Sequence, residues 1–90
     1  MICKVRLSPH AVNEYKKLPS DIKPEIQEGL DSLAKSPFAG PKVKRLKGRL
    51  REYFRYRVQD YRIVYTVDQK AAIVYVDYIQ HRREIYRNIK

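Results

Sequence analysis

Three arginines within eight residues form the part of this sequence best suited to chemistry. Arg55 and Arg57 are two residues apart, and Arg62 follows after a short polar break. Side chains two residues apart point to the same face of a β-strand. A planar guanidinium group donates paired hydrogen bonds to phosphate, which lysine cannot do. The spacing therefore predicts a basic strand face that binds the phosphates of a nucleic acid, RNA above all.

The residues around these arginines alternate as two strands of a hairpin. A two-residue turn at Gln59-Asp60 places every apolar residue of both strands on one face. On the other face, Arg57 then lies directly opposite Arg62, which destabilises the pair unless an anion lies between them. The structural alternative is a solvated charged face, because arginine side chains can extend into water. The predicted apolar pairs are Phe54 with Tyr65, Tyr56 with Ile63, and Val58 with Tyr61.

A second group of functional side chains lies near the C-terminus. It combines the imidazole of His81, the cations Arg82 and Arg83, and the aromatic hydroxyl of Tyr86. His81 can exchange a proton near neutral pH, and Tyr86 can stack on a base or donate to a phosphate. The alternative is an ordinary basic helix. His10, the other histidine, is interpreted as a surface or capping residue.

The elements that must position these residues follow from periodicity. The order β-α-α-β-β-β-α predicts an α+β fold with a small, mostly antiparallel, twisted sheet of about four strands. An N-terminal αα-hairpin should pack on one face of the sheet, and a short charged helix should end the chain. Ser8-Pro9 is a typical helix start, and Pro24 is early enough in its helix to be tolerated. The predicted elements are a strand over 1–7, helices over 8–18 and 19–36, a loop over 36–48, strands over 50–58, 61–67 and 71–79, and a helix over 80–90.

Composition limits the class of protein. Ninety residues suffice for one domain, 1–90, and a net charge of +10 favours a polyanionic partner. No apolar stretch approaches the roughly 20 residues that span a bilayer, and no signal peptide begins the chain, so we expect a cytoplasmic protein without membrane contact. Cys3 alternates with apolar neighbours and is interpreted as a core residue.

Metal and cofactor chemistry has no support in the spacing of the residues. Cys3, His10 and His81 do not have the spacing of metal ligands, and no glycine-rich phosphate loop occurs, so we expect no metal and no cofactor. Further contacts with RNA are expected from the basic loop, from the strand after it and from the tail. These candidates are Lys44, Arg45, Lys47, Arg51, Tyr53 and Arg83.

Four short motifs occur in an order that resembles the RelE toxins of the RelE/ParE superfamily. The resemblance covers nearly the whole chain, and the one departure is Gln59, where that pattern usually has glycine. The motifs are Leu46-Lys47-Gly48, Tyr53-Phe54-Arg55-Tyr56-Arg57-Val58, Asp60-Tyr61-Arg62-Ile63-Val64-Tyr65 and His81-Arg82-Arg83-Glu84-Ile85-Tyr86.

The resemblance implies the toxin of a type II toxin–antitoxin system, a ribosome-dependent mRNA endoribonuclease (mRNA interferase). Such toxins cleave mRNA in the ribosomal A site without a metal ion, by attack of a ribose 2′-hydroxyl on the adjacent phosphate, and leave a 2′,3′-cyclic phosphate. The implied partners are the ribosome, mRNA and a cognate acidic antitoxin.

The resemblance also implies roles for single residues. Arg62 matches the arginine that stabilises the phosphate, and Arg55 and Arg57 match basic positions that are often lysine. Tyr86 matches a tyrosine near the reacting nucleotide. Arg82 matches a tail arginine proposed as the proton donor, with His81 as the alternative for that place.

Two other functions are compatible with these residues. One is a ParE-like inhibitor of DNA gyrase with the same fold, which would bind its target and cut no RNA. The other is a non-catalytic RNA-binding module that uses Tyr53 and Tyr86 as stacking platforms, which predicts salt-sensitive binding without cleavage.

Overall fold

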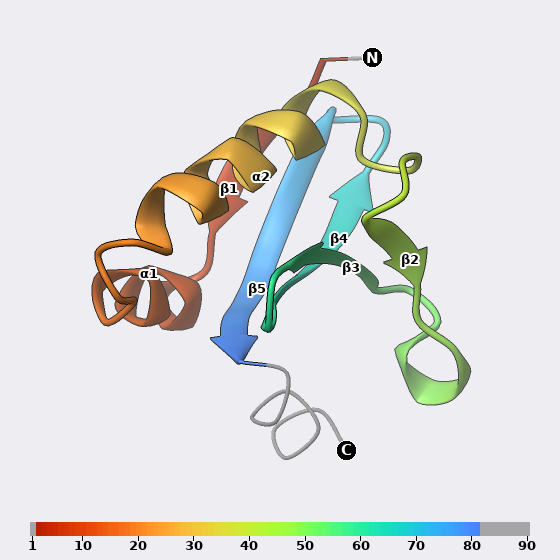
Figure 1. Ribbon diagram of the computed structural model, residues 1–90. Helices are drawn as coiled ribbons and strands as arrows, with labels where there is room; N and C mark the ends of the chain where they lie inside the picture. The colour runs from red at the N-terminus through yellow and green to blue at the C-terminus, as the bar shows by residue number, and fades with distance from the viewer. Residues whose placement is uncertain (1, 82–90) are drawn as a thin grey trace.

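The computed structural model describes residues 2–81 as a five-stranded sheet with two helices. Helix α2 lies across one face of the sheet, and α1 lies beside the end of β5 (Figure 1). The sheet order is β1-β5-β4-β3-β2, with β1 parallel to β5 and the other pairs antiparallel. The α+β class with an N-terminal helix pair is confirmed. The elements are β1, Lys4–Leu7; α1, Pro9–Lys16; α2, Lys23–Lys35; β2, Val43–Arg45; β3, Phe54–Val58; β4, Tyr61–Asp68; and β5, Ile73–His81.

The sheet has one strand more than predicted, because β2 lies inside the segment 36–48 that was expected to be a loop. This strand pairs with β3, with Val43 opposite Tyr56. Three residues are too few to display an alternating pattern. Short strands rich in lysine and arginine are common at sheet edges, where they discourage pairing with other chains. Only the tertiary partner therefore reveals β2.

Several predicted boundaries are also wrong; the helix expected from residue 19, for example, begins at Lys23. The strand expected from Leu50 begins at Phe54, because Gly48–Leu50 form a 3-10 turn in which Gly48 has a φ of +70°. Gln80 and His81, expected to begin a helix, instead extend β5, because they pair with the first residues of β4. The remainder of that predicted helix, 82–90, lies outside the described residues.

The corner between β1 and α1 follows the predicted capping pattern. Ser8 Oγ accepts a hydrogen bond from the Ala11 amide at 3.0 Å, and Pro9 occupies the first turn. The same hydroxyl donates to the Asp77 carbonyl oxygen at 3.1 Å. Ser8 therefore caps α1 and also fixes the first turn of α1 against β5.

The core lies between α2 and the sheet. Ile26, Leu30 and Leu33 form an apolar stripe on α2, and all three are buried. Cys3 is buried in the same cluster, as predicted. Across residues 2–81, neither helix has the length and apolar content needed to cross a lipid bilayer.

Gly29 allows α2 to approach the sheet closely. A Cβ atom here would lie 2.9 Å from Tyr56 Cε1 and 3.2 Å from Ile63 Cδ1. We expect Gly29→Val to lower the free energy of unfolding by about 1–3 kcal/mol, because the added methyl groups overpack this contact. Urea unfolding measures the loss. Glu28→Val is the matched control at an exposed neighbouring position, and an equal loss in both variants would contradict the packing argument.

Candidate functional site

The hairpin of β3 and β4 has the predicted register. Phe54 lies opposite Tyr65, Tyr56 opposite Ile63, and Val58 opposite Tyr61. These six side chains face α2 and the core. Arg57 consequently lies directly opposite Arg62 on the other face of the sheet.

The turn between these strands uses Gln59 where glycine would be the simplest residue. Gln59 has a φ of +53°, in the left-handed region that favours glycine. Its side-chain Nε2 donates a hydrogen bond of 2.6 Å to Glu25 Oε2 on α2. This hydrogen bond holds the turn against α2 and offsets part of the free energy that the left-handed backbone of Gln59 costs. The departure from glycine therefore leaves the hairpin register unchanged.

Arg55, Arg57 and Arg62 occupy the sheet face opposite α2, which we call the arginine face. Lys44 of β2 pairs with Arg55 and adds a fourth cation to it. Between residues 2 and 81, no carboxylate forms an ion pair with Arg55 or Arg57. Arg62 donates from Nη1 to the Tyr61 and Gln59 carbonyl oxygens at 3.2 and 3.4 Å. An anion bound here would relieve the repulsion between the opposed guanidinium groups.

The third strand of this face, β5, contains a β-bulge that decides which of its side chains face the arginines. Val76 pairs with Tyr65 and Tyr78 with Val64, so Asp77 is the extra residue. A one-residue shift exchanges the two faces of a strand. Beyond the bulge, Gln80 therefore lies beside Arg62 on the arginine face.

Asp77 brings a carboxylate to the same face. Asp77 accepts a hydrogen bond from the Tyr53 hydroxyl. Burial raises the pKa of Tyr53, and this hydrogen bond and the negative charge of Asp77 raise it further. Sequence reasoning missed Asp77, although an aspartate in an otherwise apolar strand was a usable signal. The hydroxyl of Tyr53 is engaged within the protein, and the predicted contact of Tyr53 with RNA stays a prediction.

His10 also reaches this face, which its interpretation as a surface residue did not anticipate. Its Nε2 lies 3.2 Å from Gln80 Nε2, and its ring meets the Tyr78 ring edge-on, with 5.3 Å between centroids. His10 and Gln80 are 70 residues apart, so no local pattern could have paired them. The Ser8 cap and the end of β1 at Leu7 bring them together.

Comparison with known proteins identifies the class to which this basic sheet belongs. A family model described as the ParE toxin of type II toxin-antitoxin system, parDE, matches residues 5–86. The chain belongs to this toxin family. A search of curated proteins gave no match.

Solved structures of related toxins have the same fold. The toxin is similar to a chain of the toxin–antitoxin complex RelBE2 from Mycobacterium tuberculosis, with 26% identity and a TM-score of 0.81 over 91% of this chain and 100% of that one. It is also similar to a chain of the RelE–RelB complex from Pyrococcus horikoshii, with 26% identity and a TM-score of 0.77 over 91% and 97%. YoeB from Staphylococcus aureus matches at 25% identity and a TM-score of 0.73 over 90% and 98%. Membership of the RelE/ParE superfamily, predicted from four motifs, is confirmed.

The predicted tail residues of the toxin are only partly described. His81 pairs with Tyr61, and their rings meet edge-on with 5.5 Å between centroids. Because it follows the bulge, His81 lies on the helix side of the sheet, opposite the arginine face. Arg82, Arg83 and Tyr86 lie outside the described residues, and their proposed roles stay predictions.

The basic loop is divided between the two faces of the toxin. Lys44 is on the arginine face, whereas Arg45 lies over the Phe54 ring on the other side, 5.8 Å from its centroid. Arg45 Nε also donates to the Arg51 carbonyl oxygen at 2.8 Å. Lys47 and Arg51 are exposed beside the 3-10 turn. Lys44 therefore joins the arginines, whereas Arg45 does not.

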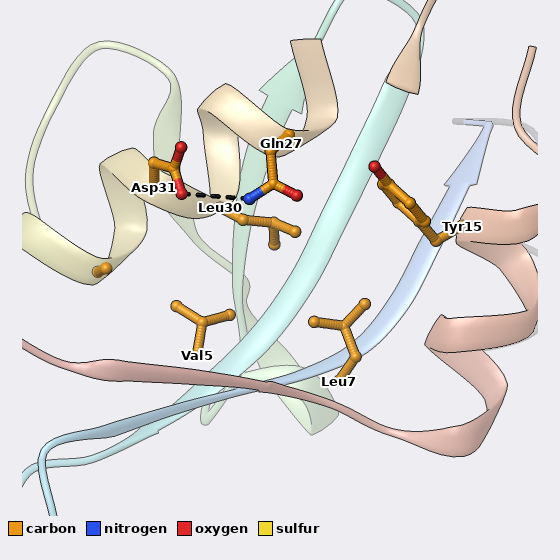
Figure 2. Close-up of a pocket in the computed structure, with 7 residues that line it drawn as sticks. Val5, Leu7, Tyr15, Gln27, Leu30 and Asp31 are labelled. Carbon is orange, nitrogen blue, oxygen red and sulfur yellow. Dashed lines mark hydrogen bonds between the residues drawn. The ribbon is translucent and has the colours of Figure 1, made fainter. Parts of the chain in front are cut away.

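The helix side of the toxin contains an open groove of about 370 Å³ between β1, α1 and α2 (Figure 2). Val5, Leu7 and Leu30 give it an apolar floor, and Gln27 and Asp31 are hydrogen-bonded to each other at 3.2 Å on its rim. The groove has no arginine in its lining. The groove therefore offers no guanidinium group to a phosphate.

Proposed function

We propose that this toxin is a ribosome-dependent mRNA endoribonuclease that needs no metal ion. The reaction is attack of a ribose 2′-hydroxyl on the adjacent phosphorus, which gives a 2′,3′-cyclic phosphate and a 5′-hydroxyl. The observation that carries the proposal is the direct opposition of Arg57 and Arg62 beside Arg55. Three guanidinium groups on one rigid sheet suit the charge that develops on phosphate oxygens in the transition state.

The ribosome has a defined task in this proposal. Arginine stays protonated and is a poor base, so the arginine face stabilises charge but cannot accept the proton of the 2′-hydroxyl. Proton transfer is assigned to the tail, with Arg82 and Tyr86 as candidates. Holding mRNA in the A site would align the 2′-hydroxyl with the scissile bond and supply much of the rate through positioning.

The proposed protein partner is a cognate acidic antitoxin. Two of the similar structures, RelBE2 and the archaeal RelE–RelB, are toxin–antitoxin complexes. The net charge of +10 and the cations of the arginine face favour an acidic partner that covers this face. Action on ribosomes places the toxin in the cytoplasm.

Inhibition of DNA gyrase is the second candidate function, because the matching family model is described by the ParE toxin. A gyrase inhibitor would bind its target and leave transcripts intact. That function assigns no reaction to the opposed pair Arg57 and Arg62, and we therefore place it second.

Expression of the toxin in cells, followed by mapping of mRNA 5′ ends, separates the two functions. We expect new 5′-hydroxyl ends within translated reading frames soon after induction, and none when translation initiation is blocked beforehand. The same cells should show no gyrase-dependent DNA breaks. Intact transcripts together with such breaks would contradict cleavage and support gyrase inhibition.

A further inference from the structure

The helix side of the toxin has a second hollow, at the corner of the sheet past the end of α2. Its volume is about 530 Å³, within the range of roughly 300–1,000 Å³ that is usual for small-molecule pockets. Phe38 is 41% exposed and meets the Phe54 ring edge-on, with 5.4 Å between centroids. The hydrogen bond from the Tyr65 hydroxyl to the Pro37 carbonyl oxygen holds this segment against β4. We call the hollow the aromatic pocket; its lining includes Phe38, Phe54, Val67, Arg45 and Glu52.

Two opposite charges line the aromatic pocket without pairing. Arg45 is held in place, because its Nε donates to the Arg51 carbonyl oxygen at 2.8 Å and its guanidinium carbon lies 5.8 Å from the Phe54 centroid. Its two terminal nitrogens donate to no other residue among 2–81. Glu52 forms no ion pair and accepts no hydrogen bond within that part of the chain. The pocket therefore offers a positioned donor and an available acceptor beside an exposed aromatic ring.

This combination of groups suits the face and the edges of a nucleobase. Unpaired bases stack on aromatic side chains and form hydrogen bonds along their edges. Guanine suits it best, because its N1–H and its N2 amino group donate side by side to one carboxylate, and its O6 and N7 accept from a guanidinium group. The other RNA bases have no two adjacent donor groups on one edge. A protein side chain with paired donors would be an arginine, which Arg45 repels.

The place of the aromatic pocket in the sheet also favours RNA as its ligand. β2 is an edge strand, and its neighbouring residues Lys44 and Arg45 lie on opposite faces. An RNA strand that leaves the arginine face past Lys44 would pass around this edge and reach the pocket at Arg45. Both residues are cations, so the phosphates of such a strand are attracted along this path.

We propose that the aromatic pocket binds an unpaired guanine of the RNA whose phosphate lies on the arginine face. Phe38 provides the stacking surface, Glu52 accepts from N1–H and the N2 amino group, and Arg45 donates to O6 and N7. This inference rests on the proposed function only in taking RNA as the ligand. The guanine is not a base at the scissile bond, since the two sites lie on opposite faces of the sheet.

Binding of 2′-O-methyl nonanucleotides to the full chain tests the proposal. Each probe has one guanosine or one inosine between four uridines on each side, and neither has a 2′-hydroxyl to attack. Inosine lacks only the N2 amino group, so the two probes have the same length and charge. At constant ionic strength, we expect the guanosine probe to bind about three- to tenfold more tightly, because inosine loses a hydrogen bond to a carboxylate. Fluorescence anisotropy of labelled probes measures both affinities.

The variants locate the preference in the pocket. Glu52→Gln should bring the ratio of the two affinities close to one, because an amide offers a single acceptor and places a donor against the base. Phe38→Ala should do the same, because the base loses its stacking surface. The matched control is Glu28→Gln, which makes the same change of charge at an exposed position of α2 outside the pocket and should keep the ratio. Arg57→Ala should weaken the binding of both probes and keep the ratio as well.

Each ratio compares a variant with itself, so a general change in affinity cancels. Equal affinities of the unchanged toxin for the two probes, or no binding, would overturn the proposal and leave the pocket to a protein partner. A preference that survives in Glu52→Gln or Phe38→Ala, or that is lost in Glu28→Gln, would overturn it too. Free guanosine 5′-monophosphate should bind at least about tenfold more weakly than the guanosine probe, because it cannot reach the arginine face as well. Equal binding would assign the pocket to a free nucleotide and overturn RNA as its ligand.

The outcome is separable from that of the cleavage experiment. The probes cannot be cleaved and no ribosome is present, so a toxin that fails to cut mRNA can still prefer guanosine to inosine. Conversely, a toxin that cuts mRNA but binds both probes equally would support the proposed function and refute this inference.

Discussion

Replacement of Arg62 by alanine is expected to lower the rate of ribosome-dependent mRNA cleavage by about 10²- to 10³-fold. Arg62 lies at the centre of the arginine face, opposite Arg57 on β3 and Gln80 on β5. Loss of a charge-assisted donor removes an interaction that strengthens as the phosphate gains negative charge. Single-turnover cleavage on programmed ribosomes measures the rate without a contribution from product release.

The matched control for Arg62→Ala is Arg6→Ala. Arg6 lies on the same face of the sheet, on β1, and pairs with Tyr75. It is exposed, so its replacement removes the same charge from the same face without touching the proposed site. We expect the cleavage rate to change by less than about threefold, because this variant only weakens the long-range positive field of the toxin. Equal losses in both variants would contradict a specific role for Arg62.

Stability should change in the opposite direction from activity. Like charges directly opposed in an antiparallel pair are destabilising, and Arg57 opposes Arg62. We therefore expect Arg62→Ala to leave the free energy of unfolding unchanged or to raise it by up to about 1 kcal/mol. A marked loss of stability in urea would show that the arginine is structural and would weaken the phosphate assignment.

Replacement of Tyr65 by alanine is expected to lower the free energy of unfolding by about 3–5 kcal/mol. Tyr65 is fully buried, and its ring stacks on Phe54 with 5.7 Å between centroids. Its hydroxyl donates a hydrogen bond of 2.6 Å to the Pro37 carbonyl oxygen, which joins β4 to the segment after α2. The expected loss is a large part of the stability of a domain of this size. Urea unfolding followed by circular dichroism measures it.

Tyr65→Phe separates the hydroxyl from the ring. It keeps the ring but leaves the Pro37 carbonyl without its donor, at an expected cost of about 1–3 kcal/mol. Burial, together with the nearby Tyr56, raises the pKa of Tyr65 well above its usual value. Unfolded Tyr65 therefore loses its proton before the folded form does, and stability should fall above about pH 10, by about 1.4 kcal/mol per pH unit. Tyr65→Phe should reduce that slope. An unchanged slope would contradict the assignment to Tyr65.

Local pattern was sufficient for the β3–β4 hairpin. Alternation over two adjacent strands and a two-residue turn predicted each pair of the hairpin, including Arg57 with Arg62. The Ser8-Pro9 start of α1 was likewise predictable, because a helix cap depends on neighbours within one turn. These features involve residues close in the chain, for which spacing alone determines which side chains share a face.

The tertiary structure decided the features that depend on distant partners. The strand β2 exists because β3 provides its hydrogen-bonding edge, and three residues contain no periodic signal of their own. The parallel pairing of β1 with β5 joins the first and last described strands, with both helices and the other three strands between them in the chain. The contact between His10 and Gln80 joins residues near opposite ends of the chain.

By itself, the sequence determined the superfamily, the α+β fold and an arginine face with Arg57 opposite Arg62. Only the tertiary structure decided what lies beside that face on β5. Without the bulge, the alternation that places Val76 opposite Tyr65 would put Ile79 beside Arg62 and His81 on the same face, and would turn Gln80 toward the helices. The bulge reverses this assignment, because a shift of one residue exchanges the two faces of a strand. A bulge depends on the register with the neighbouring strand, and that register is a property of the folded sheet.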